Sequence, residues 1–288
     1  MVKEFLSRRH KEEDPAAEMS FVDHLEALRW HIVRSLLAIL LLAIIIFWQH
    51  QWVFDNIIAG PINKDFVSYR GFCNLSHFLH LGDALCMPPL EVSMQTTTFG
   101  GQFISLFTIA FVGGFIVAFP YIFWEFWNFV KPALKPGELK NTRFAIFWVS
   151  FFFFCGTAFG YFVLAPFTFN FLANFKISGL NLMQTKPTLD DYLNNLTDIL
   201  IGCGLAFELP VLAFVLTKIG LITPNFLRRY RRYAIVIILF IAAFITPSPD
   251  WISQTIVFIP LFSLYEISIW ISNKVFKEQK EKELKEWS

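Results

Sequence analysis

Charged residues are scarce in this chain of 288 residues. They make up 16% of it, and 24 lysines and arginines nearly balance 23 aspartates and glutamates. A soluble domain carries about 25% charged residues, so this chain lacks the polar groups to cover a water-facing surface of its own size. Its 55% hydrophobic content excludes intrinsic disorder, and the lack of a basic excess excludes a typical nucleic-acid binder. The composition therefore indicates a membrane protein.

Three common catalytic motifs are missing as well. The sequence contains no G-x-x-x-x-G-K-[ST] loop for nucleotide phosphates, no H-E-x-x-H pair and no G-x-S-x-G elbow. The sequence therefore shows none of these motifs for the hydrolysis of a nucleotide, a peptide or an ester. We expect a protein that is not an enzyme and that uses neither a cofactor nor a catalytic metal.

Long hydrophobic runs, by contrast, are abundant. A membrane-crossing helix needs about 20 mostly apolar residues, and such runs occupy residues 30–52, 103–124, 144–169 and 199–217. Two more runs, 234–246 and 251–272, flank a turn that contains two prolines. We predict an all-α, polytopic membrane protein with six transmembrane helices, of which the last two are short.

Lysine and arginine are distributed unevenly among the predicted loops. They concentrate in the N-terminal segment, in the loops after the second and fourth predicted spans, and in the C-terminal tail. The exceptions on the opposite side are Lys64, Arg70, Lys176 and Lys186. Because cytoplasmic loops carry the basic excess, we predict that both termini are cytoplasmic and that the chain lies in a bacterial inner membrane.

This topology divides the chain into three parts. Residues 1–29 form a cytoplasmic N-terminal segment, residues 30–273 the transmembrane domain, and residues 274–288 a charged cytoplasmic tail. Within the first part, Ser20 and Asp23 match a capping box, and apolar residues from position 21 onward form one stripe at helical spacing. This pattern predicts an amphipathic helix that lies on the inner leaflet and then turns into the first span.

Two cysteines lie in the long outer loop after the first span. A Cys73–Cys86 disulfide closes a loop of about 14 residues and contributes about 3 kcal/mol in the chain-entropy model. A metal site is a second interpretation, because His77 and His80 complete a Cys-x3-His-x2-His-x5-Cys spacing, and two free thiols are a third. We favour the disulfide, since this spacing matches no established zinc motif.

Three glutamates interrupt the predicted spans. Glu208 lies in the middle of the fourth span, just before the helix-breaking Pro210. Glu266 lies in the sixth span, and Glu125 ends the second. A charge at mid-bilayer costs about 2.5–3.5 kcal/mol on insertion scales, so each acid either forms a hydrogen bond between helices or has a role in binding.

One alternative function depends on two of these acids. With Glu208 and Glu266 as proton carriers, the chain would be a proton-coupled secondary transporter of a small solute, and the short Pro-interrupted spans would be its broken helices. That class of transporter predicts inverted repeats. The sequence shows no repeat of this kind.

Several segments, taken in order, resemble the TatC family, the multispanning subunit of the twin-arginine (Sec-independent) protein translocase. They are FVDHLEALR before the first span, FVKPAL at 129–134 with Glu138, AFELP at 206–210, TPSPD at 246–250 with Gln254, and LYEI at 264–267. The resemblance covers residues 20–272. It implies a receptor that binds twin-arginine signal peptides of folded proteins and then assembles with small single-span subunits of TatA/TatB type, driven by the protonmotive force.

The resemblance also implies which residues recognise the signal peptide. They lie in the N-terminal segment and the first cytoplasmic loop: Leu25, Glu26, Arg29, Phe129 and Glu138. A carboxylate holds a guanidinium through two parallel hydrogen bonds, which an ammonium does not offer. Two residues before Arg29, where the family typically has Glu, this chain has Ala27, and Glu26 lies about 100° away around the helix.

Further expectations follow from the same resemblance. Glu208 is expected to contact the helix of a single-span partner inside the membrane. Structural roles are expected for Pro132, Pro210, Asp250 and Gln254. Other copies of the chain are expected partners, because a chain of this size is too small to enclose a passage for a folded protein. Membrane lipids are also expected partners, because the basic face attracts anionic headgroups.

Overall fold

The chain folds as a helical membrane protein. The computed structural model describes residues 21–63, 65–78, 80, 82–83, 86, 93–130, 142–175, 186–246 and 251–286. Within these ranges, five stretches are long and apolar enough to cross a membrane: Leu25–Trp48, Gly101–Val130, Ile146–Asn174, Leu189–Lys218 and Ser253–Glu281. The predicted class, an all-α polytopic membrane protein, is therefore confirmed, with five long apolar helices.

The first long helix, α2, runs from Phe21 to Trp48 without a break. The predicted surface helix that turns into the span near Trp30 is therefore wrong. No glycine or proline interrupts these 28 residues, so every backbone amide keeps its place in the helical ladder. The helix is about 42 Å long, which exceeds the roughly 30 Å of a hydrocarbon core.

The segment after α2 contains several short helices: α3 (His50–Val53), η1 (Phe54–Ile58), η2 (Gly60–Ile62) and α4 (Val67–Phe78). The second long helix, α5, spans Gly101–Val130. It packs along α2 at close range, since a Cβ on Gly114 would lie 2.9 Å from the backbone nitrogen of Ala43. Glycine at this position thus permits the two backbones to approach each other.

The third crossing consists of α6 (Thr142–Phe159), η5 (Gly160–Leu164) and α7 (Ala165–Asn174) in succession. The fourth consists of α8 (Leu189–Ala206) and α9 (Leu209–Lys218). The break between α8 and α9 falls at Phe207 and Glu208, because Pro210 has no amide hydrogen to donate to the preceding turn. The helix interruption expected at this point is confirmed.

The last three helices are α10 (Pro224–Arg229), α11 (Arg231–Ile245) and α12 (Trp251–Glu286). With 15 residues, α11 is short, as predicted. The prediction of a short last helix is wrong, because α12 has 36 residues and continues past Pro260 into the charged tail. Lysine, glutamate and glutamine are good helix formers, so the tail extends the helix.

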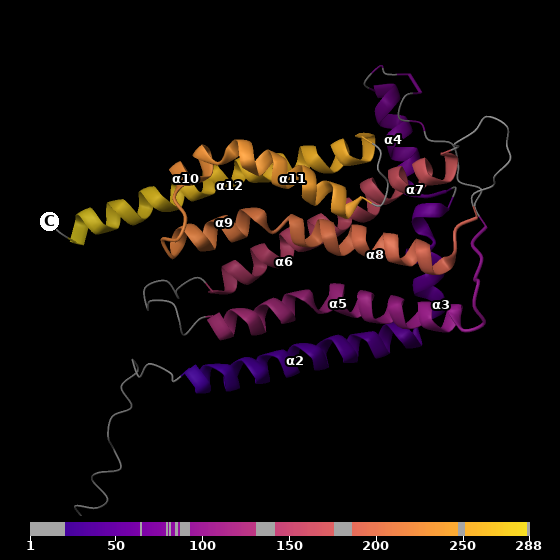
Figure 1. Ribbon diagram of the computed structural model, residues 1–288, viewed down its shortest axis with the longest axis horizontal. Helices are drawn as coiled ribbons and strands as arrows, with labels where there is room; N and C mark the ends of the chain where they lie inside the picture. The colour runs from indigo at the N-terminus through magenta and orange to yellow at the C-terminus, as the bar shows by residue number, and fades with distance from the viewer. Residues whose placement is uncertain are drawn as a thin grey trace, which may run out of the picture.

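The long helices lie side by side in Figure 1, with α2 along α5, α6 along α8, and α9 along α12. The start of α2, α10 and the end of α12 lie at one end of the molecule, whereas α4 and α7 lie at the other. Most residues of the main core come from α8, α11 and α12; the core includes Leu164, Ile199, Ala242, Val257 and Leu261. Outward-facing residues are also apolar, for example Leu41 and Phe244, as expected for a surface in contact with lipid.

Candidate functional site

Glu125 lies in a polar cluster between the first two long helices. Its side chain is 4% exposed, and it accepts a hydrogen bond of 2.8 Å from the Tyr121 hydroxyl, one turn earlier on α5. The Nδ1 atom of His31 on α2 lies 2.5 Å from its other carboxylate oxygen. Arg34 Nη1 lies 3.9 Å from that same oxygen. Glu125 thus links α2 to α5, and several polar groups offset the cost of burying its carboxylate.

Phe129 lies one turn beyond Glu125, near the end of α5. Its ring is 6.2 Å from the imidazole of His31, in an edge-on arrangement. His31 therefore contacts both the acid and the aromatic residue. Sequence reasoning missed His31, and also Tyr121, because neither belongs to a recognisable motif. The one available signal was that polar residues occur in two neighbouring spans.

The remaining predicted recognition residues of α2 lie nearer its start. Leu25 is 48% exposed, and both Glu26 and Arg29 are exposed. Within the described part of the chain, no ion pair joins Glu26 to Arg29, so their side chains face solvent separately. Outside the described residues lie Glu138, Pro132 and Asp250.

Glu208 occupies the break between α8 and α9. The residue is 8% exposed, and its Oε1 atom has no hydrogen-bond partner among the described residues. Thr157 Oγ1 on α6 has none either. Helices α6 and α8 approach closely beside this point, since a Cβ on Gly204 would lie 2.8 Å from that same Thr157 oxygen. A buried carboxylate oxygen without a donor is costly in an isolated subunit.

Glu266 is paired with a nearby arginine. Arg231 Nη2, at the start of α11, donates to the Glu266 carboxylate on α12 at 2.8 Å, and both side chains are partly exposed. At the other end of this helix pair, Gln254 Nε2 donates to the Leu239 carbonyl at 3.2 Å. Both contacts join α11 to α12.

Cys73 and Cys86 form a disulfide. This confirms the favoured interpretation and excludes the alternative of two free thiols. The disulfide connects α4 to the loop that follows it, at the end of the molecule where α4 lies. His80, one of the ligands in the metal interpretation, does not belong to the group of donor atoms around the two sulfurs. His77 does belong to that group.

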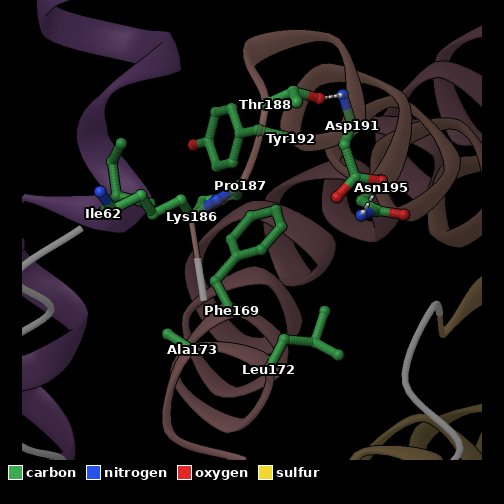
Figure 2. A pocket seen from close by; sticks show the side chains of 10 residues that line it. All are labelled: Ile62, Phe169, Leu172, Ala173, Lys186, Pro187, Thr188, Asp191, Tyr192 and Asn195. Atoms are coloured by element: carbon green, nitrogen blue, oxygen red, sulfur yellow. Dashed lines mark hydrogen bonds between the residues drawn. The ribbon is translucent and has the colours of Figure 1, made fainter. Parts of the chain in front are cut away.

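A pocket of about 410 Å³ opens near this same end, between η2, α7 and α8. Figure 2 shows that Phe169 and Tyr192 form its aromatic walls, with ring centroids 4.7 Å apart. The Thr188 hydroxyl accepts from the Asp191 amide at the start of α8. No sequence motif pointed to this pocket, because its walls come from distant segments and contain ordinary residue types.

Comparison with known proteins agrees with the resemblance seen in the sequence. The family described as "Sec-independent protein translocase protein (TatC)" matches residues 23–260. The Sec-independent protein translocase protein TatC of Blattabacterium sp. subsp. Periplaneta americana is 39% identical over 263 residues, which cover 91% of this chain and 98% of that protein. The TatC protein of Carboxydothermus hydrogenoformans is 32% identical over 254 residues, covering 88% and 93% respectively.

Two solved structures share the fold. A crystal structure of the twin-arginine translocase receptor TatC is 31% identical, with a TM-score of 0.66 over 88% of this chain and 99% of that one. A crystal structure of the same receptor in DDM is 30% identical, with a TM-score of 0.67 over 87% and 99%.

Proposed function

Because the chain belongs to the TatC family of Sec-independent protein translocase proteins, we propose that it is the subunit that binds twin-arginine signal peptides of folded precursors. A member of this family is a transport protein and not an enzyme. The observation that carries the proposal is the family match over residues 23–260. This match includes both segments in which the recognition residues are expected.

The proposed recognition surface combines the start of α2 with the end of α5 and the loop that follows. Glu138 receives one arginine of the signal peptide through paired hydrogen bonds. Phe129 and Leu25 provide apolar contact, and Glu26 and Arg29 provide polar contact. His31 supports this arrangement, because its ring contacts Phe129 while its Nδ1 meets the buried Glu125.

The proposed topology has six membrane crossings, with α11 as the short fifth crossing and with both termini in the cytoplasm. Its support is the concentration of basic residues in α10 and along the end of α12, at the same end of the molecule as the start of α2. The N-terminal segment, the helical domain and the charged tail remain the proposed divisions. The proposed location is a bacterial inner membrane, where anionic lipids contact the basic end.

The proposed partner site in the membrane is Glu208. A small single-span subunit of TatA/TatB type has a transmembrane helix, and a polar side chain on that helix can donate to the unpaired Oε1 atom. Other copies of the chain complete the assembly. Glu266 does not enter this site, because it is paired with Arg231. The transporter alternative is set aside, since it needed Glu266 as a proton carrier and the family is a protein translocase.

The test compares two signal peptides on the full chain in lipid nanodiscs. One peptide carries the arginine pair and the other carries two lysines. We expect Glu138→Gln to weaken binding of the arginine peptide about tenfold, because the paired hydrogen bonds are worth roughly 1.5–3 kcal/mol, and to change binding of the lysine peptide less. Fluorescence anisotropy measures both affinities. Glu281→Gln, which removes an exposed acid on α12, is the matched control. An equal loss for both peptides contradicts the proposal.

A further inference from the structure

The imidazole of His77 faces the Cys73–Cys86 disulfide from α4. Its Nε2 atom lies 3.6 Å from the Cys73 sulfur and 3.9 Å from the Cys86 sulfur. Asp83 Oδ1 lies 3.6 Å from the same nitrogen. Two sulfurs and one imidazole nitrogen therefore lie close together. The Cys73, His77 and Cys86 donor atoms all lie within 4.8 Å of one another.

These spacings match the edges of a zinc coordination tetrahedron. Zinc bonds are about 2.3 Å to sulfur, about 2.0–2.1 Å to imidazole nitrogen and about 2.0–2.2 Å to carboxylate oxygen. At tetrahedral angles, those bonds place sulfur about 3.6 Å from nitrogen. The two distances from His77 Nε2 to the sulfurs, 3.6 and 3.9 Å, agree with this value within a few tenths of an ångström. One change is needed: the two sulfurs must separate to about 3.8 Å, which requires the disulfide to be reduced.

The backbone around the cluster holds these donors independently of the disulfide. Cys73 and His77 are four residues apart on α4, so they share one face of the helix. The Ser76 hydroxyl donates to the Gly82 carbonyl at 2.6 Å, and the Cys86 amide donates to the Asp83 carbonyl at 3.0 Å. Gly82 has a φ of +62°, a conformation that glycine adopts without strain, and it turns the chain back toward α4.

From this geometry we propose that Cys73, His77 and Cys86 form a Zn²⁺ site when the disulfide is reduced. A dithiol reductant supplies two electrons and two protons; the S–S bond breaks, two thiols form, and the reductant becomes a disulfide. Zn²⁺ then displaces both thiol protons; the two thiolates and the neutral imidazole bind it, and water takes the fourth position. His77 and Asp83 side chains are 59% and 84% exposed, so the ion has a direct path from solvent.

The site is separate from signal-peptide recognition. It lies at the end of the molecule where α4 projects, whereas the start of α2 and the end of α5 lie at the opposite end (Figure 1). The proposal therefore does not depend on the proposed function. Metal binding by the outer loop and twin-arginine peptide binding are measured separately on the same preparation.

The experiment uses the full chain in detergent, reduced with a phosphine and titrated with Zn²⁺ against a chromophoric chelator. We expect one Zn²⁺ per chain beyond the background of the Cys73→Ser/Cys86→Ser variant, which retains Cys155 and Cys203. The oxidised protein is expected to bind at least about 100-fold more weakly, because a disulfide offers no thiolate. Substitution by Co²⁺ reports thiolate ligation through its charge-transfer absorption.

Two variants test the geometry. His77→Ala is expected to weaken Zn²⁺ binding by about tenfold or more, whereas His80→Asn, which suits the φ of +58° at that position, leaves it unchanged. Disulfide content before reduction, measured by mass after alkylation, shows that each variant folds. Equal Zn²⁺ affinity for the oxidised and reduced proteins overturns the proposal. So does equal affinity for His77→Ala and the unmodified chain.

Discussion

The Nδ1 atom of His31 and the Oε2 atom of Glu125 lie 2.5 Å apart, although 94 residues separate them in the chain. Together with Arg34 Nη1, which lies 3.9 Å from the same oxygen, this contact is a polar connection between α2 and α5. The Glu125 carboxylate is almost completely shielded, so it depends on His31 and Tyr121 for the interactions that water would otherwise supply. The connection lies about one turn from Phe129, where the recognition surface is proposed.

His31→Ala is expected to destabilise the protein by about 1–3 kcal/mol, because it removes the short partner of a buried acid. Thermal unfolding in detergent, followed by tryptophan fluorescence, measures the change. His50→Ala is the matched control. Among the described residues, the His50 imidazole contacts the carbonyl and the ring of Phe47, three residues earlier in the chain. This substitution is expected to have a small effect.

A double-mutant cycle tests whether the two residues act together. The variant carrying both His31→Ala and Glu125→Gln is expected to lose less stability than the sum of the two single variants, by about 0.5–3 kcal/mol. Strict additivity would show that the contact between His31 and Glu125 contributes no coupling.

Gly156→Ala is expected to disrupt the packing of α6 against α8. A Cβ at this position meets the Cys203 carbonyl and lies 2.8 Å from Cβ of Phe207, and backbone cannot move aside as a flexible side chain can. We expect a loss of about 1–3 kcal/mol, measured by thermal unfolding. Gly71→Ala on α4 is the control: its Cβ meets nothing within 4 Å, so it is expected to gain about 0.5–1 kcal/mol from helix propensity. A neutral Gly156→Ala would contradict the close approach.

Glu208→Gln separates stability from assembly. Because Glu208 Oε1 has no partner among the described residues, removing the charge is expected to leave the isolated subunit equally or more stable. Copurification of single-span partners is expected to fall. Glu266→Gln provides the comparison: it breaks a partly exposed ion pair with Arg231, costs at most about 1 kcal/mol, and leaves copurification unchanged. A large loss of subunit stability in Glu208→Gln would contradict the partner role.

Ala27→Glu is expected to strengthen binding of the arginine signal peptide. The substitution adds a carboxylate to the partly buried face of α2, about 100° from Glu26 around the helix. A gain of up to about fivefold corresponds to one exposed charged contact, and peptide anisotropy measures it. Ala27→Gln, of the same shape but without charge, is the control. If both variants bind alike, the start of α2 contributes no carboxylate to recognition.

Much of the fold could be predicted from local properties of the sequence. The spans, the break before Pro210 and the short α11 follow from hydrophobic length and from the missing proline amide. The disulfide was preferred because the spacing of the cysteines and histidines matches no established zinc motif. Two predictions were wrong because they assumed that a helix ends where the membrane ends. Both α2 and α12 extend beyond the membrane, because segments rich in good helix formers are also helical in water.

The sequence by itself determined the membrane class, the uneven distribution of lysine and arginine, and the family, because each depends on composition or on residue order. Only the tertiary structure decided which polar residues meet: His31 with Glu125, Arg231 with Glu266, and His77 with the disulfide. In a membrane, the lipid-facing and protein-facing sides of a helix are both apolar. Periodicity therefore does not reveal how each helix is rotated about its axis, and that rotation determines which side chains come into contact.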